Sequence, residues 1–501
     1  MTPDGVYFAR AAENIFSGKG IRLISGEDFF NHLPFYPFLV GLTNILFHDI
    51  EFSAHFVAIA AFSLSVIPLF YLVSPIYSKS TAHWVSLLYI TNGFLLIYSH
   101  LPLTEQTFTF LVILELLLIR CMTSKDKFSL VFGILLGVLG GLLYLTRSEG
   151  LLYYAAGAFS VLLLSPKPIS FRIRSVFISL IIFLIFLLPY VYFIHQHTDQ
   201  WRIHEQAPGN ILQRQLHISQ PGEYLELKKT FQGLTEDKMR LKLEELSAQS
   251  SVFKTLAGSH FALFRSVPFS MMWRLLELNK YLFAGIGFFF IGASFFQGAW
   301  DYRRKKDEFL LLLFLLPFVV NFMLVFEPKR FIPIFPILLI WVGNGIEVFR
   351  NWAKEAFNLK ERKSLGAALS VCVFFAAFSG GYIQYSVSKN LLPWEYQKLG
   401  VWMKTHIPGI ENQKVLAREP FVNFYSGSKI MKLPYVEKLE DLLFYMRHHQ
   451  AKYFVVGEDL DLPMRDTYLS LLDDSASFPE DVSRRHIVQG RQKVILYEIT
   501  P

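Results

Sequence analysis

Long apolar runs without charge are the feature that most limits how this chain can fold. The run at 175–193, SVFISLIIFLIFLLPYVYF, contains no charged residue, and about 20 apolar residues are enough to cross a bilayer core. Several such runs recur. Only 18% of the residues are charged and 52% are hydrophobic, whereas about a quarter are charged in an ordinary soluble domain. The sequence therefore predicts a polytopic membrane protein.

The apolar runs predict about ten spanning helices. They lie near 53–74, 82–99, 105–121, 129–146, 150–165, 175–194, 280–298, 309–326, 331–349 and 365–386. The stretch 34–47 is apolar but short, so we expect a re-entrant or interfacial helix there rather than a full crossing.

Basic residues in the loops predict the orientation, because Lys and Arg are retained on the cytoplasmic side. Five loops hold sixteen of them: Lys79, Arg120, Lys125, Lys127, Lys167, Arg172, Arg174, Arg303, Arg304, Lys305, Lys306, Arg350, Lys354, Lys360, Arg362 and Lys363. The three alternate loops hold only Arg147, Lys329 and Arg330. The first set is therefore expected in the cytoplasm. The net charge of +7 is explained by this topology, so it does not indicate nucleic-acid binding.

This orientation predicts the domain organisation. Residues 1–52 form a first extracytoplasmic loop, and 195–279 form a second one with amphipathic, interfacial helices. The membrane domain is all-α and consists of 53–194 and 280–386. Because the chain starts outside without a signal peptide, we expect that an upstream helix is missing from this sequence.

The tail, 387–501, changes character. KVLAREPFVNFYSG, AKYFVVGEDL and QKVILYEIT read as strands, whereas YQKLGVWMKTH and EKLEDLLFYMRHH read as helices. Such alternation predicts a small extracytoplasmic α/β domain.

Ionisable residues gather on the predicted outer face, where polar groups usually line a water-filled cavity. The candidates are Asp4, His32, Glu105, Arg147, Lys329 and Arg330. Carboxylates act as general bases or metal ligands, and Lys and Arg bind phosphate.

Each candidate also has a structural interpretation. Asp4 is placed to cap a helix, and His32 opens a proline-rich turn. Glu105 suits the positive end of a helix dipole with Thr104 as its cap. Arg147 is close enough in sequence to pair with Glu149, and the basic pair at 329–330 suits interface anchors.

In order along the chain, these segments resemble the C-type membrane glycosyltransferase (GT-C) superfamily. The closer likeness is to the branch of protein O-mannosyltransferases and bacterial lipid A aminoarabinose transferases. The segments that carry it are DGVYFARAAENIFSGKG, HLPFYPFLVGLTNILF, PLTEQTF, LTRSEG, EPKRFIPIFPILLIWVGNGIE and YQKLGVWMKTHIP with VLAREPFVNFYSG.

The resemblance implies an inverting transfer of a sugar from a polyprenyl-phosphate donor to a glycolipid, glycan or protein of the cell envelope. Asp4 would be the general base or, with Glu105, a ligand of a divalent metal such as Mg or Mn. His32 would contact the donor, and Arg147, Lys329 and Arg330 would stabilise its phosphate. Asp4 is followed by Gly5 where protein mannosyltransferases have an Asp-Glu pair, which argues against protein mannosylation.

Two other classes of function are compatible with a polytopic chain. A transporter or lipid flippase is one alternative, but such proteins often show internal repeats and helices broken near the midplane, and neither is visible here. The second is an assembly subunit with a docking domain, which would leave the outer charges without a purpose. The favoured hypothesis is a glycosyltransferase of a bacterial inner membrane, with its C-terminal domain in the periplasm.

Overall fold

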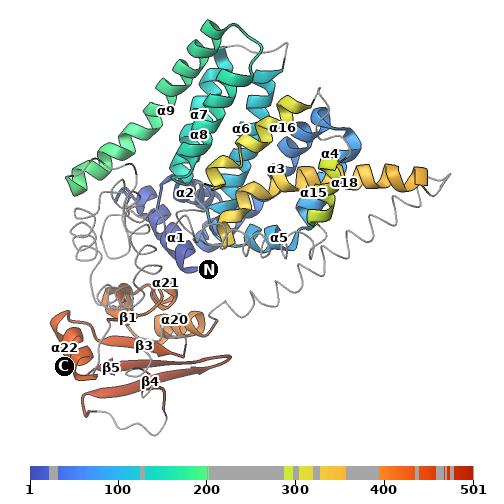
Figure 1. Cartoon of the computed structure of the whole chain (residues 1–501). Coiled ribbons are helices and arrows are strands. Elements are labelled where there is room, and N and C mark those ends of the chain that lie inside the picture. Colours follow the sequence, from blue (N-terminus) through green and yellow to red (C-terminus); the bar gives the residue numbers. More distant parts are fainter. Residues whose placement is uncertain are drawn as a thin grey trace, which may run out of the picture. The chain divides into compact units, whose positions relative to one another are not determined.

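The computed structural model forms two compact units, one built around the membrane helices and one around a small β-sheet (Figure 1). The helices α2 to α18 belong to the first unit, and α1 joins the elements from α20 to β5 in the second. The structure describes residues 1–21, 32–124, 130–199, 201, 203, 287–296, 304–319, 328–356, 394–434, 439–458, 468, 471–473 and 479–499.

All the secondary-structure elements described in the membrane unit are helices. Its elements are α2 (Phe35–Phe47), α3 (Ile50–Ile76), α4 (Lys79–Thr91), α5 (Gly93–Ser99), α6 (Glu105–Thr123), α7 (Leu130–Thr146), α8 (Gly150–Leu164), α9 (Ile169–Thr198), α15 (Gly287–Phe296), α16 (Lys305–Leu313), the 3₁₀ helix η2 (Pro328–Ile334) and α18 (Phe335–Ala356). Within this part of the chain, four helices are long and apolar enough to cross a membrane: α3, α6, α9 and the continuous segment of η2 and α18.

The helix α6 lies at the centre of this unit. It packs against α3, α7, α8 and η2, and its apolar residues, among them Phe108, Val112 and Leu116, belong to one large buried cluster. Because α6 is enclosed by other helices, its polar residues face protein rather than lipid. Its first residue, Glu105, is only 2% exposed.

Small residues set the spacing of α7 and α9. A Cβ atom added to Gly137 would lie 2.4 Å from the carbonyl oxygen of Ser179 and 2.7 Å from Cβ of Ile182. Close approach of this kind is the usual role of glycine in membrane helices, where packing replaces the hydrophobic effect as the force between helices. Substitution of Gly137 by a larger residue therefore requires the two helices to separate.

Most predicted spans correspond to helices, but the predicted span 82–99 is broken. It consists of α4 and α5, with Asn92 between them. The side chain of Asn92 accepts a hydrogen bond from the backbone N–H of Leu95 at 3.0 Å and so caps α5. The predicted span 365–386 and the interfacial helices expected in 195–279 lie outside the described residues.

The loops rich in Lys and Arg and the loops poor in them contact opposite ends of α6. Near its C-terminal end, Arg120 lies 3.7 Å from Asp307, and Lys306 donates a hydrogen bond to the carbonyl of Thr123 at 2.6 Å. At its N-terminal end it meets the α7–α8 loop and η2. The 19 residues of α6 extend about 28 Å, close to the thickness of a bilayer core.

The second unit is built on a five-stranded mixed sheet with the strand order β2-β1-β3-β5-β4. Strand β1 is parallel to β2 and β3, and β5 is antiparallel to β3 and β4. The remaining elements are α1 (Pro3–Phe16), α20 (Trp394–His406), the 3₁₀ helix η4 (Ile410–Asn412), β1 (Lys414–Ala417), α21 (Phe421–Ser426), β2 (Lys429–Lys432), α22 (Leu439–His448), β3 (Tyr453–Gly457), β4 (Val482–Gln489) and β5 (Lys493–Ile499).

Helices cover both faces of this sheet. Phe454 and Ile495 pack with Leu442 of α22 on one face, whereas Val455 and Leu496 pack with residues of α20 and α21 on the other. All five residues of β3 are buried, as expected for a strand covered on both sides. The predicted C-terminal α/β domain is thus confirmed, but the predicted strand KVLAREPFVNFYSG is only partly correct, because Lys414–Ala417 form β1 and Phe421–Ser426 form the helix α21.

The N-terminal helix α1 is part of this second unit. Val6 is fully buried in the same cluster as Leu399 and Val422. Arg10 donates a hydrogen bond to the carbonyl of Phe424 at 3.1 Å, and its guanidinium lies 4.9 Å from the centre of the Phe424 ring. The two ends of the chain therefore form one folded body.

Candidate functional site

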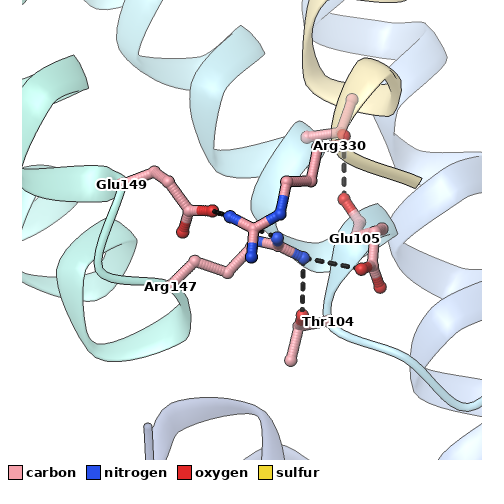
Figure 2. A network of polar contacts seen from close by, with 6 residues as sticks. Thr104, Glu105, Arg147, Glu149 and Arg330 are labelled. Atoms are coloured by element: carbon pink, nitrogen blue, oxygen red, sulfur yellow. Dashed lines mark hydrogen bonds and ion pairs between the residues drawn. The ribbon is translucent and has the colours of Figure 1, made fainter. Parts of the chain in front are cut away.

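Two carboxylates and two arginines meet at the N-terminal end of α6 (Figure 2). Arg147, in the loop between α7 and α8, donates a hydrogen bond to Glu105 Oε1 at 2.6 Å and to Thr104 Oγ1 at 3.3 Å. It also donates to Glu149 Oε1 at 3.2 Å. These contacts bring together segments 42 residues apart in the chain.

Arg330 completes the cluster from η2. Its Nη1 donates to Glu149 Oε1, the same oxygen that Arg147 contacts. The side chains of Arg147, Glu149 and Arg330 are 12%, 11% and 18% exposed, and that of Glu105 is 3% exposed. We call Glu105, Arg147, Glu149 and Arg330 the outer ion cluster.

Neighbouring charges determine the pKa values of Arg147 and Glu149 in the α7–α8 loop. Burial by itself would raise the pKa of Glu149, but Arg147 and Arg330 outweigh it and lower the pKa to about 2. Burial would likewise lower the pKa of Arg147, but Glu149 and Glu105 raise it above its usual value. The Glu149 carboxylate is thus held in its negative form by the two arginines that contact it.

The structural interpretations of these residues are partly correct. Arg147 and Glu149 do pair, as one interpretation predicts. The prediction that Thr104 caps α6 is wrong, because its side chain makes no capping hydrogen bond and accepts one from Arg147 instead. Glu105 Oε2 is buried and has no hydrogen-bond partner among the described residues.

A narrow pocket opens on this cluster. Its polar lining is formed by Arg147, Glu149 and Arg330, and its apolar lining includes Phe108, Tyr153 and Phe318. The guanidinium of Arg147 lies 5.9 Å from the centre of the Phe108 ring. Arginine side chains commonly bind phosphate, and apolar side chains form most of the lining of ligand sites.

Two further residues, Lys329 and His32, are predicted to contact the donor. Lys329 precedes Arg330 in η2, and His32 lies two residues before the cap of α2. Both are half-buried. Their assignment to the donor stays a prediction.

Asp4 lies in the first turn of α1, in the other unit. The predicted capping role belongs to Thr2, whose hydroxyl accepts a hydrogen bond from the N–H of Gly5 at 3.0 Å. Asp4 instead stands where a negative charge is favoured by the helix dipole. Its predicted role as general base is a separate matter and stays a prediction.

The divalent metal predicted at Asp4 and Glu105 is not tested by the described residues and stays a prediction. No group of three or more His, Cys, Asp and Glu side chains that could hold a metal occurs among them. Glu105 has one buried oxygen without a partner, but its other oxygen is bound to Arg147, and Mg²⁺ and Ca²⁺ typically take six or more oxygen ligands.

The chain is similar to known proteins in sequence and in fold. A model of the family described as dolichyl-phosphate-mannose-protein mannosyltransferase matches residues 31–193. ArnT from Cupriavidus metallidurans bound to undecaprenyl phosphate has a TM-score of 0.60 at 13% identity, and the match covers 99% of this chain and 93% of that one. The chain has the GT-C fold.

A second GT-C structure is larger than this chain. The oligosaccharyltransferase AglB from Archaeoglobus fulgidus, in complex with an inhibitory peptide and a dolichol-phosphate, has a TM-score of 0.59 at 13% identity. The match covers 90% of this chain but 65% of that protein. Another structure of the archaeal enzyme contains Zn and sulfate, with a TM-score of 0.60 at 12% identity. A comparison with curated protein sequences finds no match.

The GT-C fold agrees with the resemblance inferred from the sequence. The family match extends from before α2 into α9 and includes His32, Glu105 and Arg147. Sequence reasoning did not identify Glu149 as the residue that joins both arginines. The available signal was the spacing of Arg147 and Glu149 in the short TRSEG turn, which predicts only a local pair.

Proposed function

We propose that this chain is a membrane glycosyltransferase that uses a polyprenyl-phosphate sugar on the extracytoplasmic face. The observation that supports this most strongly is the convergence of Arg147 and Arg330 on one partly buried anionic oxygen beside an apolar pocket. Two guanidinium groups around one oxygen match the way arginines hold phosphate. A sugar donor outside the cytoplasm must already be carried on a lipid, and ArnT and AglB were solved with such lipid phosphates.

In the proposed reaction the acceptor hydroxyl attacks the anomeric carbon of the sugar. Asp4 accepts the hydroxyl proton, the new glycosidic bond forms, and the bond from the anomeric carbon to the phosphate oxygen breaks. Attack opposite the leaving group inverts the configuration. The lipid phosphate leaves without protonation because Arg147 and Arg330 stabilise its growing negative charge, an electrostatic form of catalysis.

The remaining assignments belong to the same proposal. Lys329 and His32 contact the donor phosphate or its sugar, and Glu105 keeps Arg147 in position through their 2.6 Å contact. The acceptor is a glycolipid, glycan or protein of the cell envelope. We place the enzyme in a bacterial inner membrane with its C-terminal domain in the periplasm.

The test compares Arg330→Ala with Arg350→Ala. Arg350 forms an i,i+3 ion pair with Glu347 in α18, so its loss controls for removal of an arginine from the same segment. Each variant is expressed in cells that lack the gene, and the glycolipids and glycans of the envelope are compared by mass spectrometry.

The wild type and Arg350→Ala should restore one missing sugar modification. Arg330→Ala should reduce it by at least about tenfold, since a charge-assisted contact to phosphate contributes about 1.5–3 kcal/mol. Equal restoration by both variants would remove Arg330 from the donor site.

A further inference from the structure

Glu149 occupies the place of an anion between two arginines. Its Oε1 accepts a hydrogen bond from Arg147 Nη2 at 3.2 Å and another from Arg330 Nη1. The same three side chains line the narrow pocket. A phosphate oxygen that bound to both arginines from this pocket would need the position that the Glu149 oxygen holds.

A phosphate and the Glu149 carboxylate cannot both occupy this position. Both are negative, and like charges a few ångströms apart in a partly buried site repel strongly. The low pKa of Glu149, about 2, means that the carboxylate does not escape this repulsion by protonation at neutral pH. Binding of a phosphate therefore requires the carboxylate to move.

Arg147 has contacts that remain when the carboxylate moves. Glu105 accepts from its Nη1 at 2.6 Å, and Thr104 accepts from the same nitrogen at 3.3 Å. Its Nη2, which faces Glu149, is then available to a ligand. Glu105 and Thr104 therefore hold Nη1 of Arg147 in place, while Nη2 can bind either Glu149 or a phosphate.

The charge of the lipid phosphate changes during the proposed reaction. A sugar-linked phosphate is a diester with one negative charge, whereas the released monoester carries about −1.5 to −2 at pH 7. Two arginines without a competitor would therefore hold the product more tightly than the donor. A site of this kind needs a means of releasing its product.

We propose that Glu149 is an internal substitute for the lipid phosphate, displaced when the donor binds and returning to the arginines to release the product. This inference rests on the proposed function. It assigns Glu149 the role of setting the affinity for isoprenyl phosphates and the rate of product release, without direct participation in bond formation.

The experiment measures binding of farnesyl phosphate and of farnesol, its uncharged analogue, to the purified full chain in detergent by calorimetry. The variants are Glu149→Gln, Glu149→Asp, Arg330→Ala and the control Glu347→Gln, which removes a carboxylate from the ion pair within α18. Thermal melting of each variant establishes that it is folded.

Glu149→Gln should bind farnesyl phosphate at least about tenfold more tightly than the wild type, the effect of losing one charged competitor. Glu149→Asp keeps the charge but shortens its reach, so it should tighten binding by a smaller factor. Glu347→Gln should bind as the wild type does, and none of these variants should change binding of farnesol.

Unchanged or weaker binding of farnesyl phosphate by both Glu149 variants would overturn the inference and leave Glu149 as a support for the arginines. The proposed function fails in a different way: the wild type would then bind farnesyl phosphate no better than farnesol, and Arg330→Ala would have no effect. If Glu149→Gln does not fold, the Glu149→Asp result decides alone.

Discussion

Glu149 keeps its charge in surroundings where burial alone would oppose it. Two arginines lower its pKa: Arg147 from the same α7–α8 loop and Arg330 from η2. Arg330 lies 181 residues after Glu149 in the chain. An ion pair of this kind depends on its partners, because removal of one leaves a buried charge uncompensated. The stability of the outer ion cluster should therefore depend on pH in a defined way.

The folded-state pKa of Glu149 lies below the usual value of 4.5. Its contribution to the free energy of unfolding is therefore present above pH 4.5 and is lost as the pH falls toward about 2. The shift corresponds to about 3 kcal/mol. In thermal unfolding, the difference in free energy of unfolding between the wild type and Glu149→Gln should stay constant from about pH 5 to 8. It should shrink below about pH 4.5. If this difference in free energy disappeared between about pH 5 and 7, the arginines would not lower the pKa of the Glu149 carboxyl.

The residues of the outer ion cluster were partly predictable. Membrane topology alone placed Glu105, Arg147 and Arg330 on one side, because their loops are the ones poor in Lys and Arg. The partners of each residue were not predictable, since the pair of Arg330 and Glu149 forms only through the packing of η2 beside α6. The missing cap at Thr104 has the same origin, because Arg147 uses its hydroxyl.

Helix packing in the membrane unit depends on glycines of α7. At Gly137 an added Cβ would meet the backbone of α9 at 2.4 Å, whereas at Gly292 in α15 nothing lies within 4 Å of such an atom. The two positions therefore form a matched pair. Both are helical, but only one is at a close contact.

Gly137→Ala should destabilise the folded protein by about 1–3 kcal/mol, the usual cost of overpacking. Gly292→Ala should be neutral or slightly stabilising, because alanine favours a helix over glycine by about 1 kcal/mol. Thermal melting in detergent measures both. Equal melting temperatures for the two variants would contradict the close packing of α7 on α9.

Helices were easier to predict than strands. The apolar run expected at 129–146 is α7, and the run expected at 150–165 is α8, because long apolar segments have few alternatives in a membrane. The break at Asn92 was signalled by the Asn-Gly pair at 92–93, a common turn sequence. Strands β2 and β4 were missed, because β2 has only two apolar residues between Lys429 and Lys432, and Arg484 and Arg485 interrupt the apolar pattern of β4.

At the scale of the whole molecule, both ends of the chain belong to one folded unit. Val6 of α1 shares a core with residues of the C-terminal domain, a long-range contact that no local pattern predicts. The loop charges predict that both ends lie on the extracytoplasmic side. This sidedness is open to a direct test.

We expect an impermeant maleimide to label Glu411→Cys on intact cells and to label Lys305→Cys only after the membrane is opened. Both residues are exposed, and the two native cysteines are first replaced by alanine. The physical reason is the excess of basic residues in the loop that contains Lys305. Labelling of Lys305→Cys alone on intact cells would reverse the proposed orientation.

We propose that this chain consumes a lipid-phosphate sugar, and direct measurement of the donor tests this proposal. Polyprenyl-phosphate sugars are extracted from cells without the gene, where the unused donor should accumulate, and are supplied with envelope acceptors to the full chain in proteoliposomes. Mass spectrometry then follows free polyprenyl phosphate for the wild type, Asp4→Asn and Glu13→Gln, a control on the same helix α1.

The wild type and Glu13→Gln should release polyprenyl phosphate and glycosylate an acceptor, and a nucleotide sugar should not replace the lipid donor. Asp4→Asn should remain folded and release none, because it lacks the base that accepts the proton. Wild-type release by Asp4→Asn would contradict its catalytic assignment, and consumption of no lipid-phosphate sugar by the wild type would contradict the proposed function itself.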